Sequence, residues 1–513
     1  MTQGRTTVPP PLPPQLACAH LIGIGGAGMS GVARIVLARG GAVSGSDAKD
    51  SGALHALRAL GARVTVGHAA ANLDQLGVDP TAIISTKAVH QTDPHNPELV
   101  EGARRGIPVI HRSAALAALM TGYRVACITG TAGKTSTTAM LTVALQHCGA
   151  DPSFLLGGDL TLSGSGAHHG SGDIFVAEAD ESDGTFLAYS PDLAVVTNVE
   201  ADHLDHHGTV EAYTASFDAF VARLAPGGLL IANADDPGST ALADRAAAGG
   251  VRVRRYGRRA TAVVDARLLE YTPAGGRGVV TVALSGSDKV TLEVTVPGEH
   301  MASNAVAALL AGLELGAPLP GLLAGLGSFG GVRRRFEFTG WAAGARIYDD
   351  YAHHPTKVAA ALRGARQVVG EGRLLVAFQP HLYSRTRDFA AEFGTALALA
   401  DVVLLLDVYG AREEPLPGVT GELIAQAVPL PADCVHYEPC RADAPTRLAA
   451  LVRPGDVVVT MGAGDVTVLG PELLAELERR RLNRADSTRL GGWPRLGGWP
   501  RPGGEVGRAA GQR

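Results

Sequence analysis

The chain has 513 residues, 46% of them hydrophobic, and a formal net charge of -5 at pH 7, which is typical of a globular protein of about three domains. The negative charge gives no general attraction to nucleic acid, and no apolar run approaches about 18 residues, so neither a nucleic-acid partner nor membrane insertion is expected. The five cysteines form no CxxC pair and the N-terminus has no apolar signal core, which predicts reduced thiols and a cytoplasmic protein.

The first 16 residues are rich in proline and are predicted to be disordered. Beyond them, a strand over residues 21–24 and a helix over residues 29–39 flank a GxGxxG turn, with Asp47 about 20 residues after the turn. This fingerprint favours a dehydrogenase when taken alone. Any ligand with a diphosphate and a ribose can use the same turn, helix N-terminus and acidic partner, so the signal is weak.

A second glycine turn, Gly130-Thr-Ala-Gly-Lys134, follows an apolar strand over residues 124–129 and opens a helix that continues over residues 139–147. It resembles a P-loop, except that Ile128 stands where the first glycine of that motif belongs. N–H groups from Gly130 to Gly133 are expected to face an anion, Lys134 to reach the β and γ phosphates, and Thr135 to ligate Mg²⁺. A triphosphate site here favours a nucleotide-tagged substrate over a redox cofactor in the first domain.

Carboxylates and a histidine follow two short strands, over residues 174–178 and 194–198, in Ala177-Glu-Ala-Asp-Glu-Ser-Asp183 and Thr197-Asn-Val-Glu-Ala-Asp-His-Leu-Asp205. Open α/β sheets bind ligands at the carboxyl ends of their strands, and Mg²⁺ prefers oxygen ligands. Glu178 and His203 are therefore candidate metal ligands. Helix caps and solvated surface charges are the alternative.

Strands over residues 373–378, 402–407 and 457–461 indicate a third α/β unit, because apolar strands again alternate with helix-length stretches. After residue 480 the sequence Arg-Leu-Gly-Gly-Trp-Pro occurs twice, at 489–494 and 495–500, with no periodic apolar face. This tail is predicted to be an appended low-complexity segment.

The motifs named so far occur in order with Asp349-Asp-Tyr-Ala-His-His-Pro-Thr356 and Phe378-Gln-Pro-His-Leu-Tyr-Ser-Arg385, and together they resemble the Mur ligase family over about residues 17–480. The resemblance implies an α/β fold of three domains: a Rossmann-like N-terminal domain, a central P-loop-type ATPase domain with a mostly parallel sheet, and a Rossmann-like C-terminal domain. The expected boundaries are 1–16 for the disordered N-terminus, 17–121 for the UDP-sugar domain, 122–331 for the ATP domain, 332–480 for the closing amino-acid domain, and 481–513 for the tail.

The family resemblance implies an ATP-dependent carbon–nitrogen ligase of peptidoglycan precursor synthesis, which joins L-alanine to the carboxylate of UDP-N-acetylmuramate. A carboxylate must be activated before an amine can attack it, and transfer of the γ-phosphoryl group of ATP gives such an acyl phosphate. Two alternatives remain: a sister ligase that adds another amino acid or a recycled peptide, and a non-catalytic nucleotide sensor. The expected cofactor is Mg²⁺, as two ions, and the oligomeric state is not predicted.

The same resemblance implies the site residues. Catalytic roles fall to Lys134, Glu178, His203, His353 and Arg385. ATP would be bound by Gly130, Thr131, Ala132, Gly133, Lys134, Thr135, Ser136, His300, Asn304, Arg335 and Asp350. The UDP-sugar would be bound by Gly25, Gly26, Ala27, Gly28, Met29, Ser46, Asp47, Ser85, Thr86 and Tyr351, and the metal ions by Thr135, Glu178 and His203. Met301 and Leu382 stand where the family usually has polar or basic residues.

Overall fold

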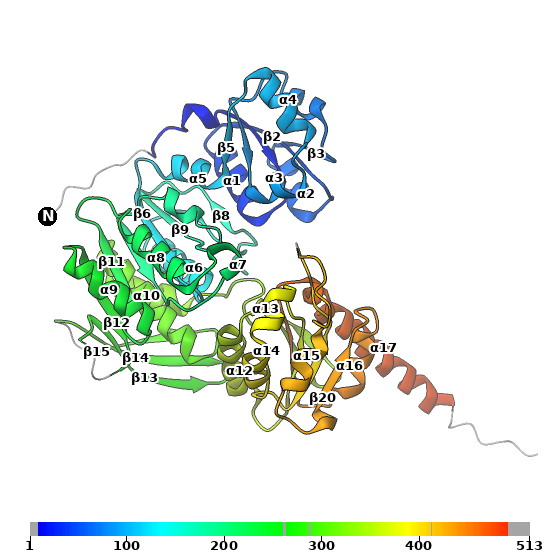
Figure 1. Ribbon diagram of the computed structural model, residues 1–513. Helices are drawn as coiled ribbons and strands as arrows, with labels where there is room; N and C mark the ends of the chain where they lie inside the picture. The colour runs from blue at the N-terminus through cyan, green and yellow to red at the C-terminus, as the bar shows by residue number, and fades with distance from the viewer. Residues whose placement is uncertain (1–8, 260–262, 287–288, 412, 491–513) are drawn as a thin grey trace, which may run out of the picture.

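The computed structural model describes residues 9–259, 263–286, 289–411 and 413–490, in which three α/β domains follow one another along the chain (Figure 1). The expected fold class is confirmed. Within the described residues no helix combines the length and apolarity needed to cross a membrane, and all five cysteines are free.

The first domain contains a five-stranded parallel sheet in the order β3-β2-β1-β4-β5. Its elements are β1 (Cys18–Ile22), α1 (Ala27–Ala38), β2 (Ala42–Asp47), α2 (Gly52–Ala59), β3 (Arg63–Val66), η2 (Ala70–Asp74), β4 (Ala82–Ser85), α3 (Lys87–Thr92), α4 (Pro97–Arg105), β5 (Val109–His111) and α5 (Arg112–Met120). The strand order reverses beside β1, so the glycine turn after β1 lies where such sheets bind ligands. Gly23, with φ +72°, ends β1 before the predicted strand end.

The proline-rich segment is ordered from residue 9, which corrects the prediction of disorder up to residue 16. Residues 14–16 form the short helix η1 (Pro14–Leu16), and Leu16 is fully buried. Arg39 donates hydrogen bonds to the carbonyl oxygens of Pro10 and Pro11. These contacts hold the segment against the first domain, whereas residues 1–8 lie outside the described residues.

The central domain contains a ten-stranded sheet in the order β15-β14-β13-β12-β11-β10-β6-β9-β7-β8. Its elements are β6 (Arg124–Thr129), α6 (Lys134–His147), β7 (Ser153–Leu155), β8 (Ala167–His168), β9 (Ile174–Glu178), η3 (Thr185–Ala188), β10 (Leu193–Val196), α7 (Leu204–His207), α8 (Val210–Val221), β11 (Leu229–Asn233), α9 (Pro237–Ala248), β12 (Arg252–Gly257), β13 (Ala266–Ala274), β14 (Arg277–Leu284), β15 (Lys289–Val294), α10 (Glu299–Glu314) and α11 (Leu319–Gly327). β6 pairs in parallel with β9 and β10, so the three segments that follow these strands meet at one sheet edge.

The C-terminal domain contains a six-stranded sheet in the order β16-β17-β21-β18-β19-β20, antiparallel only at its β16 edge. Its elements are β16 (Glu337–Ala342), β17 (Ala345–Asp350), α12 (Pro355–Val369), β18 (Leu374–Phe378), α13 (Tyr383–Asp388), α14 (Ala390–Leu397), β19 (Val402–Leu406), α15 (Gly421–Ala427), η4 (Ala432–Cys434), β20 (Val435–Glu438), α16 (Ala444–Leu451), β21 (Val457–Met461), η5 (Asp465–Val468) and α17 (Leu469–Leu490).

The last helix, α17, continues ten residues into the segment predicted to be a low-complexity tail, which corrects the start of that segment. Its surface carries ion pairs at helical spacing, from Glu476 to Arg479 and Arg480 and from Glu478 to Arg481. Pairs three and four residues apart add to the support that the buried Leu469, Leu473 and Leu477 give to the earlier part of the helix. The two Trp-Pro copies extend into residues 491–513, outside the described residues.

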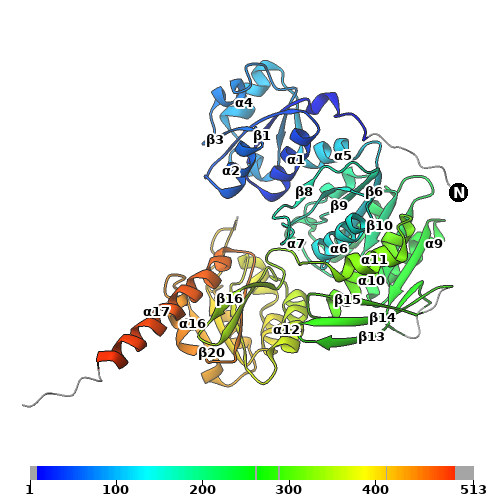
Figure 2. The ribbon, with the colours of Figure 1, turned by 180° about the vertical axis from the view of Figure 1, so that it is seen from behind.

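The C-terminal domain meets the central domain through α12, which lies beside the β13–β14 hairpin in both views (Figures 1 and 2). Gly364 of α12 comes so close to Pro297 that a Cβ at Gly364 would lie 3.0 Å from the Pro297 carbonyl oxygen. The link between the two domains contains two non-glycine residues with positive φ, Arg334 at 61° and Phe336 at 52°. The chain therefore turns sharply where the C-terminal domain begins.

Candidate active site

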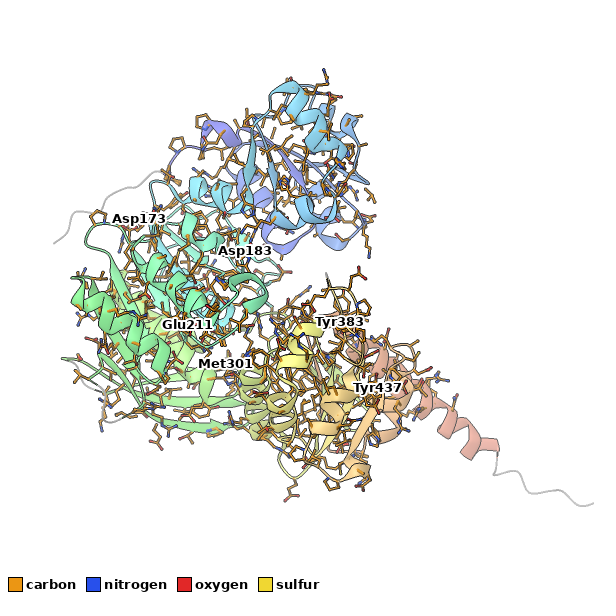
Figure 3. All side chains as sticks on the ribbon, viewed as in Figure 1. Asp173, Asp183, Glu211, Met301, Tyr383 and Tyr437 are labelled. Carbon is orange, nitrogen blue, oxygen red and sulfur yellow. The ribbon has the colours of Figure 1, made fainter. Side chains whose placement is uncertain are left out.

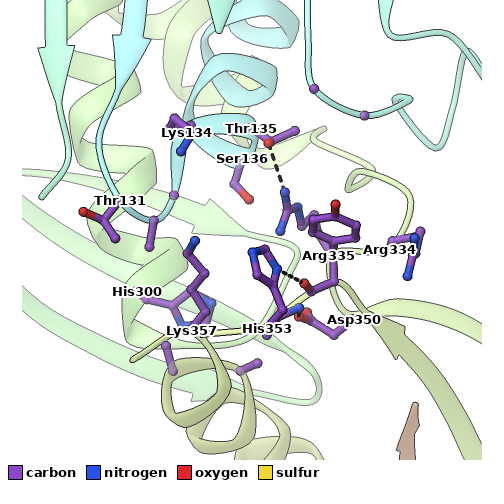
Figure 4. A pocket seen from close by; sticks show the side chains of 18 of the residues that line it. Thr131, Lys134, Thr135, Ser136, His300, Arg334, Arg335, Asp350, His353 and Lys357 are labelled. Carbon is purple, nitrogen blue, oxygen red and sulfur yellow. Dashed lines mark hydrogen bonds between the residues drawn. The ribbon is translucent and has the colours of Figure 1, made fainter. Parts of the chain in front are cut away.

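A cleft of about 1040 Å³ lies between the central and C-terminal domains and collects most of the predicted site residues (Figure 4). Its walls include the turn before α6, the start of α10 and the C-terminal segments around Arg335 and Lys357. Ala27, from the glycine turn of the first domain, also lines it. Residues of all three domains therefore border one cleft.

The turn between β6 and α6 needs glycine at both ends. Gly130 has φ +132°, and a Cβ there would collide with the Thr197 hydroxyl. Gly133 has φ +85°, and a Cβ there would lie 2.7 Å from Asn304 Oδ1. Only glycine fits both the backbone angles and the space, so the motif spacing is dictated by this close packing.

Two N–H groups of this turn have protein acceptors, which corrects the prediction that they face an anion. Thr131 donates its N–H to the carbonyl oxygen of Asn198 (3.1 Å), and Ala132 donates its N–H to Asn198 Oδ1 (2.7 Å). Asn198 thereby fixes the shape of the turn. The first N–H groups of α6, which have no acceptor within the helix, are the ones suited to bind phosphate.

Lys134 begins α6 and is held by one carbonyl and one buried carboxylate. Its Nζ donates to Gly130 O (2.8 Å) and lies 2.9 Å from Glu181, which is fully buried. Burial lowers the pKa of this lysine, but the carboxylates of Glu181, Asp180 and Glu178 outweigh that effect and raise it. Lys134 is therefore a fixed cation at the start of the helix.

Thr135 and Glu178, two of the predicted metal ligands, lie in direct contact. The Thr135 hydroxyl donates to Glu178 Oε1 (3.0 Å), and the other Glu178 oxygen accepts the N–H of Gly157 (2.8 Å). A hydroxyl and a carboxylate are oxygen donors that suit Mg²⁺, which takes further oxygens from phosphate and water. Among the described residues no three His, Cys, Asp or Glu side chains gather to form a metal site by themselves.

His203 follows β10 and has φ +54°. Its Nε2 lies 3.6 Å from Asp202 Oδ2, and its side chain is 16% exposed. Burial lowers the pKa of His203 to about 4, so at neutral pH the imidazole carries a lone pair that can bind a metal ion. Burial raises the pKa of Asp202, but neighbouring cations, led by Lys357, hold it well below its usual range.

The C-terminal domain places two arginines at the cleft. Arg335 donates from Nη2 to the Thr135 hydroxyl (3.2 Å), and the Arg334 and Arg335 guanidinium groups lie 4.8 and 5.0 Å from the centre of the Tyr351 ring. Asp350 accepts the N–H of Phe336 (2.8 Å), and burial raises its pKa to about 6. Asp350 thus holds the interdomain link in shape.

His353 and Arg385 occupy the same wall. His353 Nδ1 lies 2.8 Å from the Tyr351 carbonyl oxygen, and burial lowers its pKa (Figure 4). Arg385 is 7% exposed and donates to Asp202 Oδ1 at 3.0 Å. The two groups stand near the phosphate loop only because the domains are docked.

The start of α10 forms the wall opposite α12. His300 and Asn304 line the cleft there, whereas Ser136 of α6 and Leu382 before α13 line it from other elements. Asn304 donates its side-chain N–H to the Met301 sulfur at 3.8 Å, and Figure 3 shows Met301 where the central domain faces the C-terminal one. Met301 therefore packs against the amide that lies beside Gly133.

In the first domain, the glycine turn is stabilised by Asp47, whose Oδ2 accepts the N–H of Gly25 (2.9 Å). A Cβ at Gly28 would collide with the guanidinium group of Arg112. Ser46 is fully buried, and its hydroxyl donates to Glu98 (2.7 Å). Its role in binding the sugar nucleotide stays a prediction.

The other predicted contacts of the first domain differ in exposure. Ser85 is 1% exposed, so its side chain is enclosed in the domain, whereas Thr86 precedes α3 and is half-buried. Gly26 and Met29 belong to the turn and to α1, and Tyr351 lies across the cleft in the C-terminal domain. Their roles in binding stay predictions.

Sequence reasoning missed four charged or polar residues that hold the site together: Glu181, Asn198, Asp202 and Lys357. The first three lie inside the motifs after β9 and β10, but nothing in a motif tells which carboxylate faces a cation. Lys357 is one of only five lysines and directly follows the Asp349–Thr356 motif. The scarcity of lysine was the one available signal.

Known protein families match nearly all of the described chain. Residues 19–124 match the Mur ligase family catalytic domain, residues 128–312 the Mur ligase middle domain, and residues 334–464 the Mur ligase glutamate ligase domain. These three stretches correspond to the three sheets of the structure.

Individual relatives are similar over nearly their whole length. The UDP-N-acetylmuramate–L-alanine ligase of Saccharopolyspora erythraea is 66% identical over 460 residues, which cover 90% of this chain and 93% of the relative. The enzyme of the same name from Mycobacterium sp. (strain JLS) is 57% identical over 92% of this chain and 97% of its own. The crystal structure of UDP-N-acetylmuramate-alanine ligase from Thermotoga maritima superposes with a TM-score of 0.72 at 28% identity, covering 92% of this chain and 99% of the other.

Proposed function

The chain belongs to the Mur ligase family, and we propose that it joins L-alanine to the carboxylate of UDP-N-acetylmuramate while ATP is converted to ADP and phosphate. The observation that carries this proposal is the 66% identity, over 93% of its length, to a relative whose name states that reaction. The cleft supports it, because it brings a phosphate loop, two arginines and the sugar-side turn to one space.

The reaction has two steps in this proposal. A carboxylate oxygen of the sugar nucleotide attacks the γ-phosphorus of ATP, ADP leaves, and an acyl phosphate remains. The amine of L-alanine then attacks the acyl carbon, phosphate leaves with the bonding electrons, and the amine gives up a proton. Phosphoryl transfer needs positioning and charge neutralisation more than covalent help.

Residues of the chain supply that neutralisation. Lys134 precedes Thr135 at the start of α6, and Arg335 donates to the Thr135 hydroxyl from the C-terminal domain, so the two cations would meet the phosphates from opposite domains. Thr135 and Glu178 would hold a Mg²⁺ ion and His203 a second one, and these ions would offset charge on the transferred phosphoryl group. His353 and Arg385 would stabilise the tetrahedral species that follows attack by the amine.

We assign residues 17–121 to the sugar nucleotide, residues 122–331 to ATP, and residues 332–480 to the amino acid and to closure over the cleft. Closure excludes water, which would otherwise hydrolyse the acyl phosphate. The proposed place of action is the cytoplasm, where reduced thiols such as the five free cysteines of this chain persist.

The test is release of phosphate from ATP by the purified protein. We expect release to require UDP-N-acetylmuramate and L-alanine together, and to match the amount of UDP-N-acetylmuramoyl-L-alanine found by mass spectrometry. A panel of glycine, L-serine, D-glutamate, diaminopimelate and a tripeptide checks the choice of acceptor. Preference for a dibasic or acidic amino acid, or for the tripeptide, would overturn the proposal in favour of a sister ligase. Absence of ADP with every combination would favour a sensor.

A further inference from the structure

One carboxylate of the central domain receives two cations of the C-terminal domain. Asp202 Oδ1 accepts a hydrogen bond from Arg385 Nη2 (3.0 Å), and Asp202 Oδ2 accepts one from Lys357 Nζ (3.2 Å). The side chains of Asp202, Arg385 and Lys357 are 1%, 6% and 14% exposed. These ion pairs are therefore largely shielded from water, where a charge without a partner is costly.

The segment that carries Asp202 also carries the predicted ligand of the second metal ion. His203 follows Asp202 directly and donates its backbone N–H to Asp202 Oδ1 (2.9 Å). Glu200 accepts a hydrogen bond from the Thr356 hydroxyl at 2.7 Å. One short segment after β10 thus holds the first turn of α12 at two points and positions the imidazole.

Lys357 differs from Arg385 because nothing in the motifs or the relatives' names assigns it a role. Its side chain points into the cleft between His300 and His353 (Figure 4). Within this trio, Lys357 and Arg385 bring one more positive charge than Asp202 offsets. Burial lowers the pKa of Lys357, and Asp202, more than Glu181, opposes that effect. An anionic substrate that enters the cleft is attracted by this surplus, so the pair favours the closed cleft when substrate is present.

We propose that Asp202 and Lys357 form an interdomain latch that keeps the C-terminal domain closed over the phosphate loop and the His203 segment in place. Lys357 is a positioning residue: it acts through Asp202 and through the placement of α12. The latch rests on the proposed function only for its kinetic readout, since closure can be measured without the reaction.

The experiment compares Lys357→Met, which keeps side-chain length but removes the charge, with Lys289→Met, an exposed lysine on β15. Small-angle X-ray scattering with a non-hydrolysable ATP analogue and UDP-N-acetylmuramate measures closure. Of these two variants, we expect only Lys357→Met to have a larger radius of gyration than the unmodified protein. The same variant should have a kcat reduced about tenfold with little change in the KM for L-alanine, and it should release more phosphate than ligated product.

Lys357→Arg keeps a positive charge at this position and should therefore keep phosphate release coupled to product formation. If the effect of Lys357→Met came from lost packing alone, a positive charge at this position would make no difference. Melting temperatures confirm that the variants are folded, and Asp202→Asn serves as a second variant with the same expected signature. Unchanged scattering and unchanged coupling in folded Lys357→Met would overturn the latch. If the unmodified protein forms no product, the proposed function fails while scattering still decides on the latch.

Discussion

The two walls of the cleft are built in different ways. On the central-domain wall, Lys134 reaches Gly130 and Glu181, and Thr135 reaches Glu178, so both side chains have partners within their own domain. On the opposite wall, Arg335 and Lys357 donate hydrogen bonds across the domain boundary, to Thr135 and Asp202. The first wall is preformed, whereas the second exists only while the domains are docked. Substitutions in the first wall should lower the rate of the reaction, and substitutions in the second wall should weaken the docking of the two domains.

The largest effect is expected from Lys134→Ala, which breaks the preformed wall. Loss of a fixed cation facing the transferred phosphoryl group should lower kcat by about 10²–10³-fold. Phosphate release with UDP-N-acetylmuramate and L-alanine present measures it, and Lys289→Ala is the matched control. A variant that releases phosphate at the unmodified rate would show that Lys134 does not act on the phosphates.

A second variant separates chemistry from folding at the same position. Lys134→Ala leaves Glu181 buried without its cation. Burial already raises the pKa of Glu181 to about 7, so the carboxyl then takes up a proton, and the expected cost of the unpartnered buried group is about 1–3 kcal/mol. Lys134→Ala combined with Glu181→Gln should therefore regain thermal stability but not activity. Recovery of both would assign Lys134 a structural role.

An intermediate effect on stability is expected when the pH is lowered, because the C-terminal wall of the cleft contains a buried histidine. His354 precedes α12, is 5% exposed, and has a pKa lowered by burial to about 4 from the ordinary 6.5. As the pH falls, His354 is protonated in the unfolded chain before it is protonated in the folded protein. The free energy of unfolding that neutral His354 contributes is therefore fully present above pH 6.5 and is lost as the pH falls towards 4. The loss between pH 7 and pH 5 should be about 2 kcal/mol for this group.

Urea unfolding at pH 7, 6 and 5 measures that loss, with fluorescence of the C-terminal domain as one probe. His354→Gln cannot take up the proton, so its stability should fall less over this range than that of the unmodified protein. His90→Gln, at an exposed histidine, should keep the unmodified slope. Equal slopes for all three proteins would mean that His354 titrates alike in the folded and unfolded states.

The smallest effect is expected from Tyr271→Phe, on β13 of the central domain where it contacts α12 of the C-terminal domain. The Tyr271 hydroxyl accepts the N–H of Gly298 (2.9 Å) and donates to Gln367 Oε1 on α12 (2.7 Å). Its loss should cost about 1 kcal/mol and raise the KM for ATP slightly, because Gly298 precedes the helix that carries His300. Gln367→Leu removes only the interdomain bond. If Gln367→Leu causes the same change as Tyr271→Phe, the hydrogen bond to α12 is responsible for the effect. If Gln367→Leu has no effect, the hydrogen bond to Gly298 is responsible.

Short-range features were well predicted from the sequence. A strand, a glycine turn and a helix determine where Lys134 and Thr135 lie, because their geometry is set within about ten residues. The sequence did not reveal which distant partner each polar group has. Ser46 looks like a ligand contact at a strand end, but Glu98, 52 positions away, accepts its hydroxyl. The N–H groups of Thr131 and Ala132 likewise go to Asn198.

The sequence alone determined the family, the three α/β domains and the identity of the phosphate loop, because these depend on local patterns and on ordered motifs. Only the tertiary structure decided which charges meet across the cleft. Asp202 and Lys357 are 155 positions apart, and whether they pair depends on how the C-terminal domain docks. Docking is set by packing such as that of Gly364 on Pro297, and no local pattern encodes it.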